Sequence, residues 1–230
     1  MSGTNTPAGK KSPYAIRRLC GGLVELLYPS DVACTLCNRE AVLGTDGLCA
    51  SCRETLTACP PFAAGPLDGL AAAFVYGGGA KLGIHGLKYN RQTRLAGFFA
   101  SYMIVPESWR FDAVVPVPLH PFKLWLRTYN QSELLAKEIC RRDEYALDKT
   151  TLRRMRFTRT QTALDETARR QNVSGAFHAS SAARGRSFLL IDDVTTTHST
   201  LLACASALRQ AGAVRVYALC ACAAGHPAQK

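Results

Sequence analysis

Two adjacent carboxylates ahead of a run of hydroxyl side chains give this sequence its clearest chemical signal. Asp192 and Asp193 end an apolar stretch that begins at Phe188, and residues 195–200 then read Thr-Thr-Thr-His-Ser-Thr. If a helix follows, its first N–H groups are unpaired and carry positive dipole character, and the hydroxyls add further donors. The segment therefore predicts a cradle for a phosphate dianion. The alternative is a core strand that ends in an ordinary acidic turn.

The two acids need partners of their own. Adjacent carboxylates are costly unless hydrogen-bond donors or a cation satisfy them, and ribose hydroxyls or Mg²⁺ would do so. Open α/β sheets bind ligands at the carboxyl ends of their strands, where Asp192 and Asp193 are expected to lie. A phosphorylated sugar fits both halves of this motif.

Four cysteines form a second chemical pattern near the N-terminus. They are arranged as two Cys-x2-Cys pairs with eleven residues between them: Cys34, Cys37, Cys49 and Cys52. Thiolates at this spacing can surround one Zn²⁺ tetrahedrally, and four protein ligands leave no open position, so the zinc would be structural. The segment is too poor in large apolar residues to fold on its own core, so metal binding would stabilise it. The alternative is four unrelated thiols, and the remaining cysteines fit core positions.

Two more segments place polar side chains after apolar ones. Residues 115–131 read VPVPLHPFKLWLRTYNQ, which sets two cations and two amides behind a strand-like run: Lys123, Arg127, Asn130 and Gln131. The second segment, residues 153–177, is strongly basic. Its polar residues of interest are Arg159, Gln161, Arg169 and Asn172. Both sets could contact an anion, or could be solvated surface charges.

Taken in order, these segments resemble the ComF family, in which a zinc ribbon precedes a type I phosphoribosyltransferase-like domain. The acidic pair and hydroxyl loop resemble the motif that binds 5-phosphoribosyl 1-diphosphate (PRPP). Residues 115–131 resemble a family segment that ends in Arg-Gly-Phe-Asn-Gln, and residues 158–177 resemble its flexible hood. A further match is a helix that ends in Leu-Lys-Tyr at Tyr89, for which we assign Lys88 no role. The resemblance spans roughly residues 25–223.

The resemblance implies a role for each group. Asp192 and Asp193 would hold the ribose hydroxyls, and the loop would hold the 5-phosphate. Lys123 and Arg127 would contact pyrophosphate, with Asn130 and Gln131 as donors, and the hood would close over the ligand. The expected PRPP-binding residues are Asp192, Asp193, Thr195, Thr196, Thr197, His198, Ser199 and Thr200.

The chain departs from the family pattern at two glycines. His198 replaces the glycine of the hydroxyl loop, and Thr128 with Tyr129 replaces the usual Gly-Phe. Glycine allows a positive φ and a close approach of the backbone to a ligand. The two glycine losses therefore count against turnover more than against binding.

Composition limits the class of protein. The 230 residues include 28 Lys and Arg against 17 Asp and Glu, a formal charge of +11, and 47% are hydrophobic. A real core can form, and the positive charge favours nucleotides, phosphorylated sugars, nucleic acid or an anionic surface. The sequence contains no run long enough for a transmembrane helix and no convincing signal peptide. We therefore expect a cytoplasmic protein with reduced cysteines.

The order of the expected elements is that of an α/β protein. We expect a disordered tail (1–13), an N-terminal helix and zinc ribbon (14–60), and a phosphoribosyltransferase-like domain (61–230). The fold class is α/β with a doubly wound, mainly parallel sheet of the type I phosphoribosyltransferase fold. Strands are expected at 70–76, 113–118, 188–194 and 214–222, and helices at 14–28, 80–88, 95–104, 131–142 and 200–211.

The function follows from the resemblance and leaves alternatives open. The expected ligand is PRPP or a related ribose phosphate, with Mg²⁺ bound alongside PRPP. The family implies a role in DNA uptake or utilisation in natural transformation, with single-stranded DNA and the competence helicase or uptake machinery as possible partners. The alternatives are a catalytically inactive factor that binds single-stranded DNA or nucleotides, a true phosphoribosyltransferase of nucleotide metabolism, and a PRPP-sensing regulator.

Overall fold

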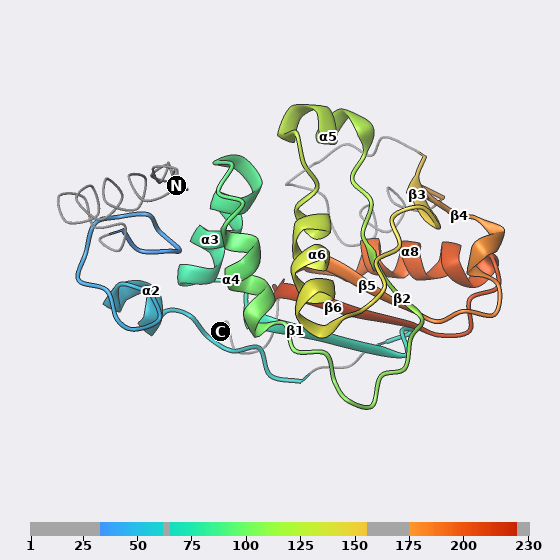
Figure 1. The fold of residues 1–230 in the computed structure, drawn as a ribbon, viewed down its shortest axis with the longest axis horizontal. Helices are drawn as coiled ribbons and strands as arrows, with labels where there is room; N and C mark the ends of the chain where they lie inside the picture. The colour runs from blue at the N-terminus through green and yellow to red at the C-terminus, as the bar shows by residue number, and fades with distance from the viewer. Residues whose placement is uncertain (1–32, 62–64, 156–174, 225–230) are drawn as a thin grey trace, which may run out of the picture.

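The computed structural model describes residues 33–61, 65–155 and 175–224, and the chain outside these ranges is drawn as a grey trace (Figure 1). Four parallel strands form the central sheet in the order β1-β6-β5-β2. Their bounds are β1 (Gly69–Val75), β2 (Ala113–Pro116), β5 (Phe188–Thr195) and β6 (Val216–Ala223). The two central strands are almost continuously apolar because helices bury both of their faces.

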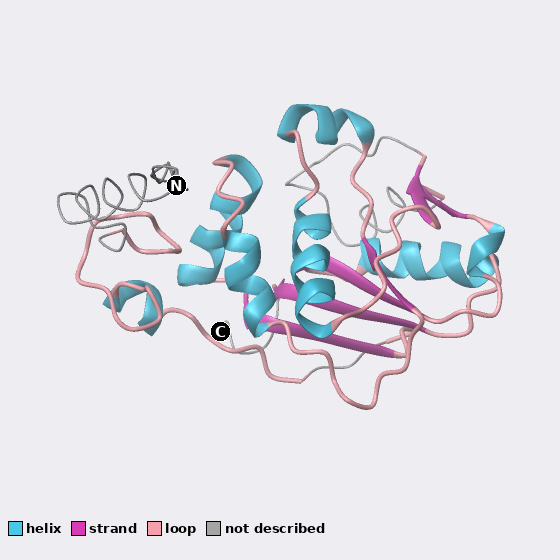
Figure 2. Ribbon diagram, in the orientation of Figure 1, coloured by secondary structure: helices cyan, strands magenta, loops and turns pink. Residues whose placement is uncertain are grey.

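Helices cover both faces of this sheet (Figure 2). Residues of β5 alternate between them: Leu189 and Ile191 pack with one set of helices, and Phe188 and Leu190 pack with α8. The first set is α3 (Gly78–Tyr89), α4 (Leu95–Tyr102) and α6 (Gln131–Asp143), and α8 is Ser199–Gln210. This arrangement confirms the predicted doubly wound α/β class with a parallel sheet.

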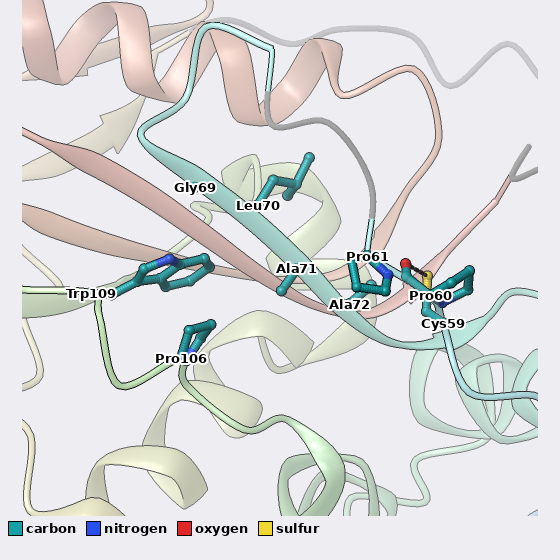
Figure 3. A pocket seen from close by; sticks show the side chains of 9 residues that line it. All are labelled: Cys59, Pro60, Pro61, Gly69, Leu70, Ala71, Ala72, Pro106 and Trp109. Carbon is teal, nitrogen blue, oxygen red and sulfur yellow. Dashed lines mark hydrogen bonds between the residues drawn. The ribbon is translucent and has the colours of Figure 1, made fainter.

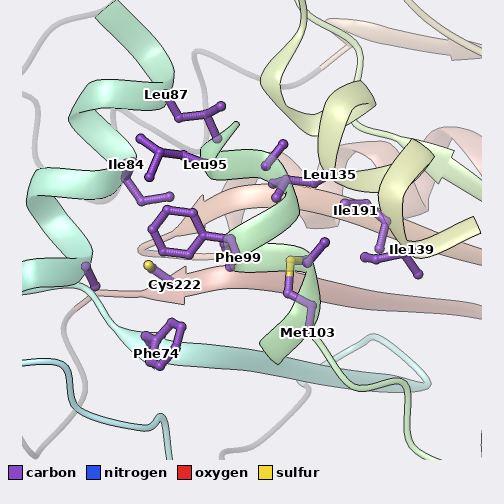
Figure 4. Packing of buried hydrophobic residues seen from close by; sticks show 14 of the residues in the cluster. Phe74, Ile84, Leu87, Leu95, Phe99, Met103, Leu135, Ile139, Ile191 and Cys222 are labelled. Carbon is purple, nitrogen blue, oxygen red and sulfur yellow. The ribbon is translucent and has the colours of Figure 1, made fainter. Parts of the chain in front are cut away.

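The larger buried cluster fills the space between the sheet and α3, α4 and α6 (Figure 4). Phe99 is fully buried at its centre, and Phe74 packs edge-on against it with ring centroids 6.2 Å apart. Leu36 and Leu48 of the cysteine module belong to the same cluster. The module therefore shares its core with the α/β domain, which fits its own shortage of apolar residues.

Eight predicted strands and helices of the α/β domain are confirmed, with ends that differ by at most two residues. The predicted helix at 14–28 lies outside the described residues. Three features were not predicted: the short helix α2 (Ala50–Glu54), the helix α5 (Pro121–Arg127), and the hairpin of β3 (Leu152–Arg154) with β4 (Phe177–Ala179).

Helix α5 forms because both of its ends are capped. His120 Nδ1 accepts a hydrogen bond of 3.1 Å from the Phe122 amide, and Pro121 occupies the first helical position. Proline is favoured there because its missing N–H would be unpaired in any case. Thr128 then ends the helix in the left-handed conformation. This helix carries Lys123 and Arg127 inward and leaves Trp125 76% exposed.

Candidate functional site

The acid pair lies at the carboxyl end of β5, where the sheet meets the N-terminus of α8. Asp192 is 8% exposed and Asp193 is 4% exposed. Oδ1 of Asp192 accepts hydrogen bonds of 2.9 Å from the Ser132 hydroxyl and of 2.9 Å from the Asp193 amide. The two carboxylates are therefore held by specific donors at the sheet edge where ligands bind in this class of fold.

Lys88 provides the cation for the second acid. Its Nζ lies 2.7 Å from Oδ2 of Asp193, with side chains 20% and 5% exposed. Burial by itself would lower the pKa of Lys88, but the carboxylates of Asp193 and Asp192 raise it above its usual value. Lys88 therefore stays charged and forms a buried ion pair with Asp193.

Among the described residues, no cation forms a comparable ion pair with Asp192. Burial, followed by the neighbouring charge of Asp193, raises the pKa of Asp192 to about 7. Lys88 and the Ser132 hydroxyl oppose this shift only in part. The acid pair thus contains one paired carboxylate and one whose charge is held at a cost in free energy near neutral pH.

The hydroxyl loop between β5 and α8 is closed by its own side chains. The Thr195 hydroxyl lies 2.7 Å from His198 Nδ1, and the hydroxyls of Thr197 and Ser199 are 2.8 Å apart. Thr196 is exposed, whereas Thr195 and Ser199 are buried. These groups surround the first turn of a twelve-residue helix, whose N-terminal amides favour an anion.

Both residues that replace a family glycine keep the backbone conformation that glycine favours. His198 has φ of 58° and Thr128 has φ of 68°. The two substitutions therefore keep the left-handed turns and store strain in them, of about 1–3 kcal/mol each. A β-branched residue such as threonine is the less tolerant of the two.

We predict that Thr128→Gly raises the free energy of unfolding by up to about 1 kcal/mol, because glycine adopts a positive φ without strain. Chemical denaturation measures the change. Ser206→Gly, on the exposed side of α8, is the matched control and is expected to lose about 0.5 kcal/mol. Equal destabilisation by both glycines would contradict the assignment of strain to Thr128.

The N-terminus of α6 joins the acid pair to the end of β2. The Asn130 side chain donates to the Val117 carbonyl at 3.0 Å and accepts from the Ser132 amide at 3.0 Å, which caps the helix. Ser132 then reaches Asp192. Gln131 is 5% exposed, and no described residue donates to its Oε1. The structure thus brings the predicted Asn130 and Gln131 next to the predicted acids through Ser132.

Four cations gather around this edge. Burial, then the charges of Arg154, Arg127 and Lys88, lower the pKa of Lys123. Burial likewise lowers the pKa of Arg154. The nearby Cys204 and Asp192 act in the opposite direction and raise it in part. Like charges held this close favour a ligand with several negative charges.

Sequence reasoning missed four contributors to the site: Lys88, Tyr129, Ser132 and Arg154. The sequence carries a signal for Lys88, because the Leu-Lys-Tyr ending of α3 resembles the family pattern. The other three depend on contacts between segments far apart in the chain. The predicted hood residues Arg159, Gln161, Arg169 and Asn172 lie outside the described residues.

The acid pair by itself does not present a site for Mg²⁺. Magnesium prefers free carboxylate and water oxygens in octahedral geometry. Here Asp193 is paired with Lys88, and Asp192 accepts from Ser132 and the backbone. The expectation that these residues attract Mg²⁺ is therefore not supported by the donor set.

A separate hollow of about 380 Å³ lies beside β1, at the opposite edge of the sheet from β2 (Figure 3). None of its described lining residues is Lys, Arg, Asp or Glu, so these residues offer no charge with which to hold a phosphate. Its lining residues are Cys59, Pro60, Pro61, Gly69, Leu70, Ala71, Ala72, Pro106 and Trp109.

The four cysteines of the N-terminal module meet at one point. Their sulfur atoms all lie within 4.8 Å of one another. Although burial opposes ionisation, hydrogen bonds with Arg39 lower the pKa of Cys37 to about 6. Hydrogen bonds from backbone amides also lower the pKa of Cys34 against the effect of burial. Four sulfurs in this arrangement can bind a metal ion such as zinc. Zinc is bound by the deprotonated thiolate form of cysteine, which a lowered pKa favours.

The fold and the two sites together define a phosphoribosyltransferase-like α/β protein with a cysteine module consistent with a zinc ribbon. Comparison with curated proteins identifies the family to which the chain belongs. The DNA utilization protein YhgH of Escherichia coli O157:H7 is 30% identical over 217 residues, which cover 82% of this chain and 96% of that protein. The chain therefore belongs to the family of the DNA utilization protein YhgH and competence protein F, the ComF family.

Other similarities agree with this assignment. Competence protein F of Haemophilus influenzae is 36% identical over 104 residues, which cover 44% of this chain and 45% of that protein. No family model matches the chain.

Among solved structures, glutamine PRPP amidotransferase from B. subtilis is 18% identical with a TM-score of 0.37, and the match covers 60% of this chain and 26% of that one. A phosphoribosyltransferase from Corynebacterium diphtheriae is also 18% identical, with a TM-score of 0.34, and the match covers 60% and 72%. Similarity this weak adds nothing about ligands.

Proposed function

We propose that this protein binds the ribose 5-phosphate group of PRPP, or of a related sugar phosphate, at the carboxyl ends of β2 and β5. One observation carries the proposal: a buried acid pair adjoins a hydroxyl-rich loop at a helix N-terminus, and cations lie near the acids. The acids supply acceptors for sugar hydroxyls, and the loop supplies donors for a phosphate.

Each group has a distinct task in this proposal. Backbone amides and hydroxyls of residues 195–200 would bind the 5-phosphate, and Asp192 with Asp193 would accept from the ribose hydroxyls. Lys123 and Arg127 on α5 would bind the diphosphate, and the predicted hood would cover it. Mg²⁺ would enter with the diphosphate of PRPP and would not be bound by the acid pair.

Catalysis is a separate question from binding. Transfer of the ribosyl group would break the C1–diphosphate bond, and positioning with charge stabilisation would supply most of the acceleration. None of the described residues at the site stands out as an obligatory nucleophile. Pyrophosphate release in the presence of a panel of nitrogenous bases measures transfer directly.

Calorimetric titration of the purified protein tests the binding proposal. PRPP with Mg²⁺ and ribose 5-phosphate are expected to bind, whereas ribose without phosphate and glucose 6-phosphate are not. Ribose lacks the phosphate group, and glucose 6-phosphate keeps the phosphate but carries a different sugar. Absence of binding by both ribose phosphates would refute the proposal.

A role in DNA utilisation is the second part of the proposal. Relatives are named DNA utilization protein and competence protein F, and we propose that this chain serves the same process with uptake proteins as partners. We also propose a cytoplasmic setting with reduced thiols. In the part of the chain that the structure describes, no helix has the length and apolarity to cross a bilayer.

Single-stranded DNA binding without turnover is the alternative function, and helix α5 favours it. Phe122 is 53% and Trp125 76% exposed, with ring centroids 6.1 Å apart, and Lys123 and Arg127 lie on the same helix. Exposed aromatic rings are the usual platform for stacked bases, and the half-buried cations on the same helix add positive charge that attracts the DNA backbone.

If α5 binds single-stranded DNA, Trp125→Ala weakens binding of a fluorescent oligonucleotide by about 1–3 kcal/mol, because one stacked base is lost. Binding should also weaken steeply as salt rises. Val42→Ala, at a 95% exposed apolar residue in the cysteine module, is the control and is expected to bind normally. Salt-independent binding would contradict the α5 surface.

We further propose that the cysteine module holds one structural Zn²⁺ and that residues 14–60 and 61–230 are the two units of the chain. The shared core of the described part supports a fixed association between them. Leu36 packs against α3 so closely that a Cβ at Gly83 would lie 2.5 Å from its methyl carbon.

A further inference from the structure

The Lys88–Asp193 ion pair occupies the position where the family resemblance expects a carboxylate to be open to the ligand. Nζ and Oδ2 are 2.7 Å apart, and only 5% of the Asp193 side chain is exposed. A buried carboxylate with a lysine at this distance already has its countercharge. It gains little from a second cation.

The residues on either side of Lys88 in the chain, Leu87 and Tyr89, are both in contact with the segment that contains Arg127 and Tyr129. The Tyr129 hydroxyl donates to the Leu87 carbonyl, and the Arg127 guanidinium lies 4.9 Å from the centre of the Tyr89 ring. Leu87 is in the last turn of α3, where backbone carbonyls lack helical partners. Tyr129 thus satisfies one of these carbonyls and fixes the end of α3 beside the acid pair.

The charge balance around the acids opposes a divalent metal ion. Lys88 neutralises Asp193, and Asp192 is bound by the Ser132 hydroxyl. The charges of Arg127 and Lys88 also act on Lys123. Among the described residues a Mg²⁺ ion would therefore meet several cations here, whereas a phosphate would be attracted.

We infer that Lys88 is a resident cation for the acid pair, held there by Tyr129, and that the site therefore binds a ribose 5-phosphate group without a divalent metal ion. The inference rests on the proposed function and adds the condition under which the ligand binds. Lys88 is a positioning residue: through the ion pair it orients Asp193 as an acceptor, as Mg²⁺ could do in a site without a lysine.

The test is a calorimetric titration of ribose 5-phosphate, once with EDTA and once with Mg²⁺. The wild type is expected to bind equally well in both, within about threefold. Lys88→Gln is expected to lose about tenfold or more in EDTA, since a charge-assisted interaction is removed, and to recover part of this with Mg²⁺. Lys88→Arg should keep metal-independent binding, and Lys81→Gln, on an exposed position of α3, should match the wild type.

The outcomes separate this inference from the proposed function. If the wild type binds ribose 5-phosphate only with Mg²⁺, the resident-cation inference fails and the proposed function stands. If neither ribose 5-phosphate nor PRPP binds under any condition, both fail. The wild-type titrations decide these points even if Lys88→Gln is unstable. If the folded variant binds in EDTA as the wild type does, Lys88 has no such role.

Discussion

Cys34→Ser is expected to release zinc and to lower the melting temperature by about 10–20 °C. The serine hydroxyl is a poor ligand for Zn²⁺ compared with a thiolate, and the remaining three sulfurs would leave the site open. Zinc binding supplies about 10–16 kcal/mol of apparent folding free energy to isolated modules of this size. Without it, the described cysteine module should unfold.

The effect extends beyond the module because its apolar side chains are part of the main core. Leu36 and Leu48 are 2% and 1% exposed and belong to the cluster that contains Phe99. Loss of two such side chains from the core removes about 3–6 kcal/mol of burial. For a chain of this length, each kcal/mol corresponds to about 2–4 °C.

Metal analysis and differential scanning calorimetry measure the two parts of this prediction. Cys59→Ser is the matched control, because Cys59 is near in sequence but is not among the four sulfurs that lie together. The control is expected to keep zinc and nearly all of the stability. A wild type that contains no metal and is equally stable after treatment with a chelator would contradict the structural role of zinc.

The described α/β elements were predictable because each has a strong local pattern. β5 and β6 are apolar runs, and α8 begins after a cluster of hydroxyl residues and ends before Gly212. The cysteine spacing likewise predicts a site whose ligands lie in two short turns. Such features depend on neighbours in the chain, so the sequence displays them directly.

The unpredicted parts of the site depend on contacts between distant residues. Lys88 pairs with Asp193 across more than one hundred residues, and Ser132 reaches Asp192 across sixty. Helix α5 was missed for a different reason: its exposed apolar side chains and inward cations invert the pattern that identifies a surface helix. The residues that cap α5, His120 and Thr128, are single residues, and they do not change the hydrophobic periodicity by which a helix is recognised.

Asp192→Asn is expected to make the protein more stable near neutral pH and to weaken its binding of ribose phosphates. Asparagine keeps the size of the side chain and can still accept from the Ser132 hydroxyl, but it has no charge to bury. In the wild type the pKa of Asp192 is raised from 3.8 to about 7, chiefly by burial. The folded state therefore favours the protonated acid.

The sign of the pH dependence follows from this shift. Between these two pKa values the folded protein holds a proton that the unfolded chain has released, so stability falls as pH rises from about 4 to about 7. At about 1.4 kcal/mol per unit, the contribution of Asp192 changes by up to about 4 kcal/mol. In Asp192→Asn this slope should disappear, which leaves the variant more stable than the wild type at pH 8.

Asp148→Asn provides the contrast, because hydrogen bonds from Thr151 and Thr150 lower the pKa of Asp148 to about 2 despite partial burial. Loss of the Asp148 carboxylate should therefore destabilise the protein at neutral pH. Urea denaturation at pH 5 and pH 8 compares both variants with the wild type. If Asp192→Asn is the less stable protein at pH 8, the carboxylate is not held at a cost.

The ligand titration completes the argument for Asp192. A carboxylate that accepts from a ribose hydroxyl contributes about 1.5–3 kcal/mol, so Asp192→Asn should weaken ribose 5-phosphate binding by about 10- to 100-fold. A variant that gains stability while losing affinity would mean that the fold keeps this buried charge for the ligand. If affinity is unchanged while stability rises, Asp192 contributes nothing to recognition, and the placement of the ribose at the end of β5 would have to be abandoned.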